Sequence, residues 1–139
     1  MVLGYDVGSR VMRALRPRGP FEGDRGRGFA SHAMGGVFGA AAAASGCTDL
    51  NPVQIRHLLS YTSQQASGIT SWQTDVDHIE KTFDFAGMPA RSGVTSATMV
   101  EAGFTGVWDV FEGFNNLFDS YPSIMTGRLC STNWAAVTR

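Results

Sequence analysis

The sequence predicts an all-α protein, and three observations favour that fold class. Apolar residues recur every three or four positions in several segments, which is the spacing of one face of an α-helix. No segment of useful length alternates apolar and polar residues, as a half-buried strand would. Asn, Pro and Gly stand where helices begin and end. We therefore expect a multi-helix array without internal repeats, joined by both short and long loops.

The first two helices are expected over residues 2–15 and 35–45. In the first, apolar residues recur at a four-residue spacing, and Pro17 ends the pattern. A loop rich in Gly, Pro and Arg follows over residues 16–28. The second consists mostly of Gly and Ala, and Gly46 is expected to close it. Because an alanine face buries little area, we expect this helix to be central, with Gly39 and Ala43 against another helix.

The next two helices have clear end signals. Asn51 and Pro52 are typical of an N-cap and a first helical position, and the helix that they start loses its pattern near Gly68. A further helix follows Pro89 and is stopped by Gly103. The inward faces are expected to be Val53, Ile55, Leu58 and Leu59 in the earlier helix, and Val94, Ala97 and Val100 in the later one.

A last helix is expected over residues 107–118, where aromatic residues form a thick stripe that Pro122 ends. Residues 123–139 show no period. We therefore expect residues 1–122 to form one domain, which a chain of 139 residues is long enough to fold, and residues 123–139 to be a tail of unassigned structure.

The composition is that of a globular protein. Hydrophobic residues make up 43% of the chain and charged residues 17%. A net charge of -1 provides no basic field for nucleic acid, and no segment has the pattern of a membrane span or a signal peptide. Two cysteines and three separate histidines indicate neither a disulfide framework nor a zinc site. We expect a cytoplasmic protein that holds no metal.

Two Gly-rich segments carry the titratable residues best suited to chemistry. Residues 27–44 and 81–106 each run from a predicted turn into a small-residue helix, where backbone N–H groups favour an anion. Lys81 lies beside aromatic residues that can desolvate it, which lowers the pKa of a lysine and suits a base or an anion anchor. Otherwise Lys81 is a surface charge. Asp84 is either a helix cap or the group that orients Lys81.

His32 and Arg91 are the other candidates in these segments. His32 stands among small residues just before the predicted helix. An imidazole there can move a proton near neutral pH, or it can make only a structural hydrogen bond. Arg91 falls near a helix start, where its guanidinium can hold a carboxylate through two hydrogen bonds or can remain solvated.

Six short motifs follow one another along residues 3–118. They are 3–7 (LGYDV), 27–29 (RGF), 36–42 (GVFGAAA), Lys81 with the Gly-rich residues 87–93, 103–106 (GFTG) and 109–113 (DVFEG). Together they resemble the helical domain of the MmgE/PrpD family, which includes 2-methylcitrate dehydratase, cis-aconitate decarboxylase and iminodisuccinate epimerase. The chain is much shorter than those enzymes, so we expect a piece of that domain.

The resemblance implies a reaction in which a base removes a proton next to a carboxylate while cationic groups hold the charge. The outcome is loss of water, loss of carbon dioxide or epimerisation, with no metal or organic cofactor. On this basis the site assignment is Lys81 and His32 for catalysis, and Arg91 and Asp84 for substrate binding. The implied partners are a small carboxylate and either a second copy of the chain or a second, smaller α+β domain beyond Arg139.

Two positions differ from the pattern that many members of the family share. Ala30 stands where many have a histidine, with His32 two residues further on, and Asp84 stands where many have the histidine of Lys-x-x-His. We expect a truncated protein with little or no activity of its own. The alternative is a non-catalytic helical module that oligomerises through its Gly/Ala helix and its aromatic last helix, or that binds small anions at the same turns.

Overall fold

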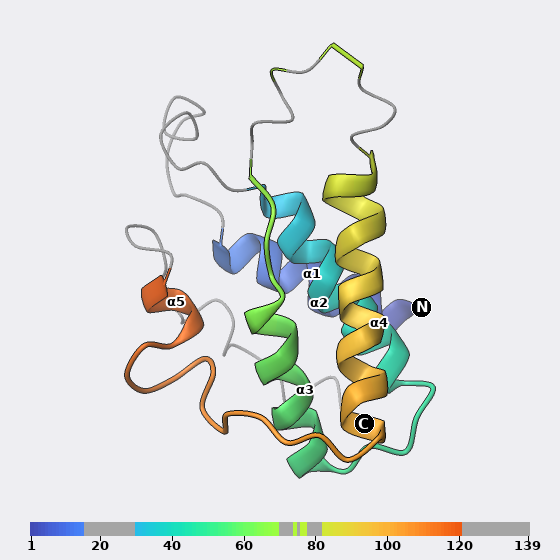
Figure 1. Cartoon of the computed structure of the whole chain (residues 1–139), viewed down its shortest axis with the longest axis vertical. Helices are drawn as coiled ribbons and strands as arrows, with labels where there is room; N and C mark the ends of the chain where they lie inside the picture. The colour runs from blue at the N-terminus through green and yellow to red at the C-terminus, as the bar shows by residue number, and fades with distance from the viewer. Residues whose placement is uncertain (16–29, 70–73, 75, 78–81, 121–139) are drawn as a thin grey trace.

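The computed structural model describes residues 1–15, 30–69, 74, 76–77 and 82–120. Every regular element in these ranges is a helix, which confirms the predicted all-α class. The elements in Figure 1 are α1 Val2–Leu15, α2 Ser31–Ser45, α3 Pro52–Gln64, the π-helix η3 Phe83–Gly87, α4 Met88–Glu101 and α5 Leu117–Ser120. As expected for a central Gly/Ala helix, α2 contacts α1, α3, η3 and α4.

Glycines form the contact between α1 and α2. The two helices run in opposite directions, so that Gly4 lies beside Gly39 and Ala43, whereas Gly8 lies beside Gly35 and Gly39. A methyl group on Gly8 would be 2.5 Å from the carbonyl oxygen of Gly35, and one on Gly4 would be 2.6 Å from that of Gly39. The two backbones therefore touch. The prediction that Gly39 and Ala43 pack against another helix is confirmed.

Small residues also line the contact between α2 and α4, but these helices run in the same direction. A methyl group on Gly36 would be 3.2 Å from Cβ of Pro89. Four residues later on each helix, a methyl group on Gly93 would be 2.9 Å from Cβ of Ala40 and 2.3 Å from the carbonyl oxygen of Val37. Residue numbers therefore increase in the same direction along the two paired helices. As a result, the N-terminal ends of α2 and of η3–α4 lie at the same end of the molecule (Figure 1).

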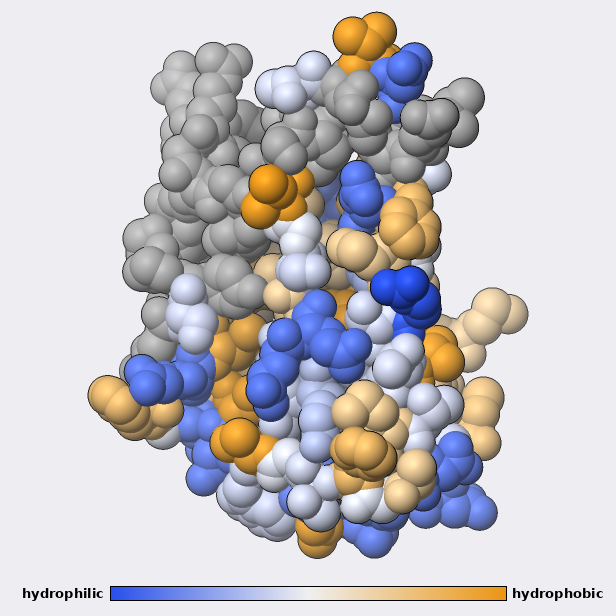
Figure 2. Space-filling view, viewed as in Figure 1, coloured by the Kyte–Doolittle hydropathy of each residue, from blue (hydrophilic) through white to orange (hydrophobic). Residues whose placement is uncertain are grey.

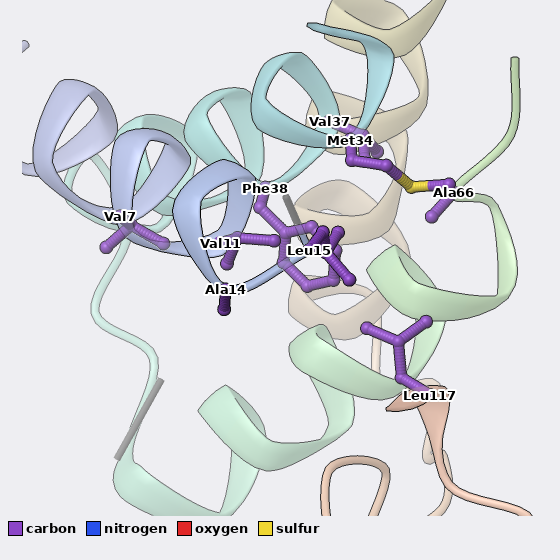
Figure 3. Packing of buried hydrophobic residues seen from close by; sticks show 9 residues of the cluster. All are labelled: Val7, Val11, Ala14, Leu15, Met34, Val37, Phe38, Ala66 and Leu117. Carbon is purple, nitrogen blue, oxygen red and sulfur yellow. The ribbon is translucent and has the colours of Figure 1, made fainter. Parts of the chain in front are cut away.

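Larger apolar side chains close the core around α2. Phe38 is 1% exposed and lies among Val11 and Leu15 of α1, and Leu117 reaches the same cluster from α5 (Figure 3). Burying a side chain of this size contributes about 1.5–3 kcal/mol. A second cluster joins α2, α3 and α4 through Ala41, Leu58, Ala97 and Val100. Thus α1 and α5 share the first cluster with α2, whereas α3 and α4 share the second with it.

The start of α3 matches its prediction. Oδ1 of Asn51 accepts hydrogen bonds from the backbone N–H groups of Val53 and Gln54, at 2.9 and 3.0 Å. In return, Oε1 of Gln54 accepts the N–H of Asn51 at 2.9 Å, which completes a capping box ahead of Pro52. The predicted apolar face is only partly correct, because Val53 is 48% exposed.

The end of α4 also matches. Gly103 has a φ of 95°, and the N–H groups of Gly103 and Phe104 donate to the carbonyl oxygens of Val100 and Met99. This is a Schellman motif, in which a left-handed residue satisfies the last carbonyls of the helix. Of the predicted inward residues, Ala97 and Val100 are buried in the cluster with α2 and α3, but Val94 is 47% exposed and is not part of that cluster.

The predicted helix over residues 107–118 is wrong. An irregular segment covers residues 103–116, and α5 begins only at Leu117. Gly113 and Asn115 have φ angles of 85° and 57°, and residues in this left-handed region cannot continue a right-handed helix. The aromatic spacing that favoured a helix instead places some rings in the core and leaves others exposed, among them Phe114 at 93%.

Side chains of α3 hold the irregular segment in place. Oγ of Ser60 accepts the N–H of Val107 at 2.9 Å. Nδ1 of His57 lies 3.1 Å from the carbonyl oxygen and 3.2 Å from the nitrogen of Gly106. A methyl group on Gly106 would be 2.8 Å from both Cβ and Oγ of Ser60, so the segment runs directly against the helix. At Gly106 and Val107, backbone polar groups are therefore satisfied by side chains rather than by helical hydrogen bonds.

Two further predictions about α2 need correction. The helix begins at Ser31 instead of residue 35, and Gly46 closes it with a φ of -71°, so the ending does not use a left-handed residue.

The loop predicted over residues 16–28 and the tail over residues 123–139 lie outside the described residues. Among the residues that the structure does describe, no helix has the length and apolar character needed to cross a bilayer.

Candidate functional site

His32 lies in the first turn of α2, not in a turn that precedes it. The N-cap is Ala30, and the side chain of His32 is exposed. Its imidazole pairs with the ring of Phe85 in η3, with centroids 6.2 Å apart and planes inclined at 58°. This distance is inside the roughly 4.5–7 Å range of aromatic pairs. His32 is therefore held at the point where α2 meets η3.

Asp84 and Arg91 lie on the elements opposite His32. Asp84 is exposed in the first turn of η3, next in sequence to Phe85. Arg91 is exposed in the first turn of α4, two residues after Pro89, which packs against α2. Two residues correspond to roughly 200° around a helix of 3.6 residues per turn, so Arg91 lies on the face of α4 away from α2. The structure thus does not bring Arg91 against His32.

Lys81 falls outside the described residues, which resume at Thr82. The structure consequently shows the surroundings of His32, Asp84 and Arg91 but not those of the lysine expected to act in catalysis. The catalytic assignment of Lys81 and His32 and the binding assignment of Arg91 and Asp84 remain predictions.

The helical glycines of the two candidate segments have a packing role. Gly36 lies inside α2 and Gly93 inside α4, as the predicted helices require, and close helix packing explains both. Gly87 was expected in a turn before the helix, but it ends the π-helix η3. Residues 27–29 of the first segment lie outside the described residues. The N-termini of α2 and of η3–α4 nevertheless lie at the same end of the molecule, where an anion could bind. Each carries a partial positive charge that favours an anion nearby.

Phe85 is the residue that sequence analysis missed at this site. It was visible only as one of the aromatic residues after Lys81. A signal does exist in the spacing, because 85, 89 and 93 are four apart, as are 32, 36 and 40. This equal spacing pairs 32 with 85, 36 with 89 and 40 with 93, but only if α2 and α4 are already known to run in parallel. Within the described part of the chain, no group of three His, Cys, Asp or Glu residues is placed to hold a metal ion.

The fold and this end of α2 define a helical domain organised around a Gly/Ala helix with a histidine in its first turn. The chain matches the family model of the MmgE/PrpD N-terminal domain over residues 1–124. It therefore belongs to the MmgE/PrpD family, and the resemblance expected from its motifs is confirmed. A search of the curated proteins found no match to the chain.

Proposed function

We propose that the chain forms one wall of a site for a small di- or tricarboxylate, in a cytoplasmic protein related to lyases and epimerases. The observation that carries this proposal is the match to the MmgE/PrpD N-terminal domain over residues 1–124. The place of His32 supports it. This exposed imidazole stands where two helix N-termini favour an anion, and histidine is the side chain best suited to move a proton near neutral pH.

In this proposal the base removes a proton next to a carboxylate of the substrate. Lys81 and His32 are the proposed proton-transfer groups, and Arg91 and Asp84 the proposed contacts to substrate. A second domain or a second copy of the chain supplies the opposite wall. We further propose that the chain alone has little or no turnover, because proton abstraction requires groups fixed on both sides of the substrate and the exclusion of water.

The test is a titration of citrate and of tricarballylate into the wild type and Lys81→Ala, with a dehydration assay in parallel. A hydrogen bond to a charged group contributes about 1.5–3 kcal/mol, so we expect Lys81→Ala to weaken binding about tenfold or more. Arg56→Ala is the matched control. It also removes one positive charge, but Arg56 lies on α3 beside Asp109, at a salt-bridge distance of 3.4 Å.

Two results would contradict the proposal. Equal binding by the wild type and Lys81→Ala would remove Lys81 from the site. Robust turnover by the chain alone would show that its site is already complete.

The alternative function is oligomerisation without catalysis, and the exposed apolar residues of the segment after α4 favour it. Phe104, Val107 and Trp108 are 53%, 59% and 49% exposed, and Phe114 is almost fully exposed. On the face shown in Figure 2, apolar surface is interspersed with hydrophilic residues. Light scattering of the wild type and of Phe114→Ser tests this role. It must be done with a reductant, because Cys47 is an exposed free thiol.

For this alternative we expect the wild type to associate and Phe114→Ser to associate less. A monodisperse species of 14.9 kDa for the wild type would rule the alternative out.

A further inference from the structure

The four-residue pairing between α2 and α4 extends to their N-terminal ends. Ala40 meets Gly93, and Gly36 meets Pro89. One step further toward the N-termini, the same spacing reaches His32 on α2 and Phe85 on η3, whose rings form the aromatic pair. The His32–Phe85 contact is therefore the last step of a continuous helix contact, not a chance approach of two surface side chains.

The Gly36–Pro89 contact, next to the His32–Phe85 pair, leaves the two backbones little freedom to move apart or together. Gly36 has no side chain, and its hydrogen points at Pro89, whose side chain is buried and whose ring is rigid. The backbone carbonyl oxygen of Phe85 would itself lie 3.8 Å from a methyl group on Gly36. The backbone that carries Phe85 is thus fixed against the backbone that carries His32, one helical turn away.

The π-helix supplies the remaining geometry. η3 widens the turn just before α4, and single π-turns inside or beside α-helices recur at functional sites. Within that turn the two phenylalanines differ. Phe85 is half-buried against His32, whereas Phe83 is 53% exposed and its ring lies over Gly87, 3.3 Å from where a methyl group would stand.

We propose that Phe85 is a positioning residue for His32: its ring restricts the rotation of the imidazole at the shared end of the two helices. This inference rests on the proposed function for its meaning, because it assigns Phe85 to the orientation of a proposed proton-transfer group. The contact itself stands independently of that function.

The first experiment measures the orientation of the imidazole without any ligand. Proton spectra of the His32 ring are recorded at one fixed pH for the wild type, Phe85→Leu, Phe85→Tyr and the matched variant Phe83→Leu. A neighbouring aromatic ring shifts these resonances. We expect Phe85→Leu to move them by a few tenths of a part per million and to lose the cross-peaks that mark a single ring rotamer.

Phe85→Tyr keeps the ring and should retain both signatures, and Phe83→Leu should leave both unchanged. A general loss of structure would alter all histidines and both leucine variants alike, so the three-way comparison separates it from positioning. The inference is overturned if Phe85→Leu leaves the His32 resonances and rotamer unchanged, or if Phe83→Leu changes them equally.

The second experiment adds tricarballylate as a probe to the same proteins. If His32 meets the carboxylate only when it is oriented, Phe85→Leu should bind several-fold more weakly than the wild type, and Phe85→Tyr and Phe83→Leu should bind equally well. Equal binding by wild type and Phe85→Leu would overturn the link between positioning and the site. If the wild type itself does not bind the probe, the proposed function fails, and the resonances of His32 still decide whether Phe85 orients it.

Discussion

Glycine serves opposite purposes in the middle and at the end of α4. At Gly93 the backbone is ordinary helix and the neighbours leave no room, since a methyl group would be 2.3 Å from the carbonyl oxygen of Val37. At Gly103 a methyl group would meet nothing within 4 Å, but φ is 95°. Neighbouring atoms require the first glycine, and its own backbone conformation requires the second.

This difference extends to the two regions that these glycines represent. α2 contacts α1 and α4 through backbone atoms and small residues, so one added methyl group pushes two helices apart. The segment over residues 103–116 is attached to α3 by separate side-chain hydrogen bonds, such as that from Val107 to Ser60. Loss of one such bond leaves the others in place. Substitutions should therefore cost more in the first region than in the second.

The largest effect is expected for Gly93→Ala. The added methyl group overlaps the backbone of Val37 and Ala41, and overpacking of this kind costs about 1–3 kcal/mol and occasionally more. Alanine regains up to about 1 kcal/mol through its better helix propensity. Because two backbone atoms lie within 2.7 Å of the added methyl group, the cost should fall at the upper end of this range. We therefore expect the free energy of unfolding to fall by about 2 kcal/mol, measured by urea denaturation followed by circular dichroism. Unchanged stability would mean that α2 and α4 separate at no cost.

Ser60→Ala should have the next largest effect. Ser60 is fully buried, and its Oγ accepts hydrogen bonds from the N–H of Val107 at 2.9 Å and from Nε2 of Gln64 at 3.1 Å. Leaving these donors without an acceptor should cost about 1–2 kcal/mol. Amide hydrogen exchange should become faster at Val107 and remain unchanged in α1. Equal acceleration in both places would indicate global destabilisation instead of a local release of the segment.

Gly103→Ala should cost less than Gly93→Ala, about 1 kcal/mol, because only the left-handed backbone opposes the new side chain. The measurement is the same urea titration, made side by side with Gly93→Ala. If Gly103→Ala proves the more destabilising of the two, the distinction between the two kinds of glycine is wrong.

The smallest effect, and one of opposite sign, is expected for Ser63→Ala. Ser63 is 7% exposed, and its Oγ has no hydrogen-bond partner in the part of the chain that the structure describes. Replacing a buried hydroxyl that makes no hydrogen bond should leave stability unchanged or raise it by up to about 1 kcal/mol. Ser60→Ala is the matched control on the same helix. A loss as large as that of Ser60→Ala would show that Ser63 has a partner in solution.

The helical core was predictable because its signals are local. The four-residue stripe of α1 and the Asn51–Pro52 start of α3 depend on residues adjacent in the sequence, and both predictions hold. The helix expected over residues 107–118 was predicted from a genuine aromatic spacing. The prediction is wrong because that spacing carries no information on the left-handed conformations of Gly113 and Asn115 or on the hydrogen bonds from α3. Tertiary contacts decided that segment.

The candidate site divides in the same way. His32 was selected from its own chemistry, and the structure does place it at the shared end of two helices. Phe85 and the orientation of Arg91 depend on the parallel pairing of α2 with α4, for which a single sequence carries no direct signal. The turn expected around Gly87 is helical for the same reason, because the sequence carries no direct signal that η3 continues into α4. The close approach of the Gly/Ala helix to its neighbours was visible in its own residues, and the structure confirms it.

The glycine contact between α1 and α2 has a consequence for temperature. It excludes little apolar surface from water, because Gly4, Gly8, Gly35 and Gly39 have no side chains to bury. Its attraction is mainly dispersion between closely approaching atoms, and it adds little to the heat capacity change of unfolding. The cluster around Phe38 depends on the hydrophobic effect, which weakens on cooling. On cooling toward the freezing point of water, the share of the attraction between α1 and α2 that comes from the glycine contact should therefore increase.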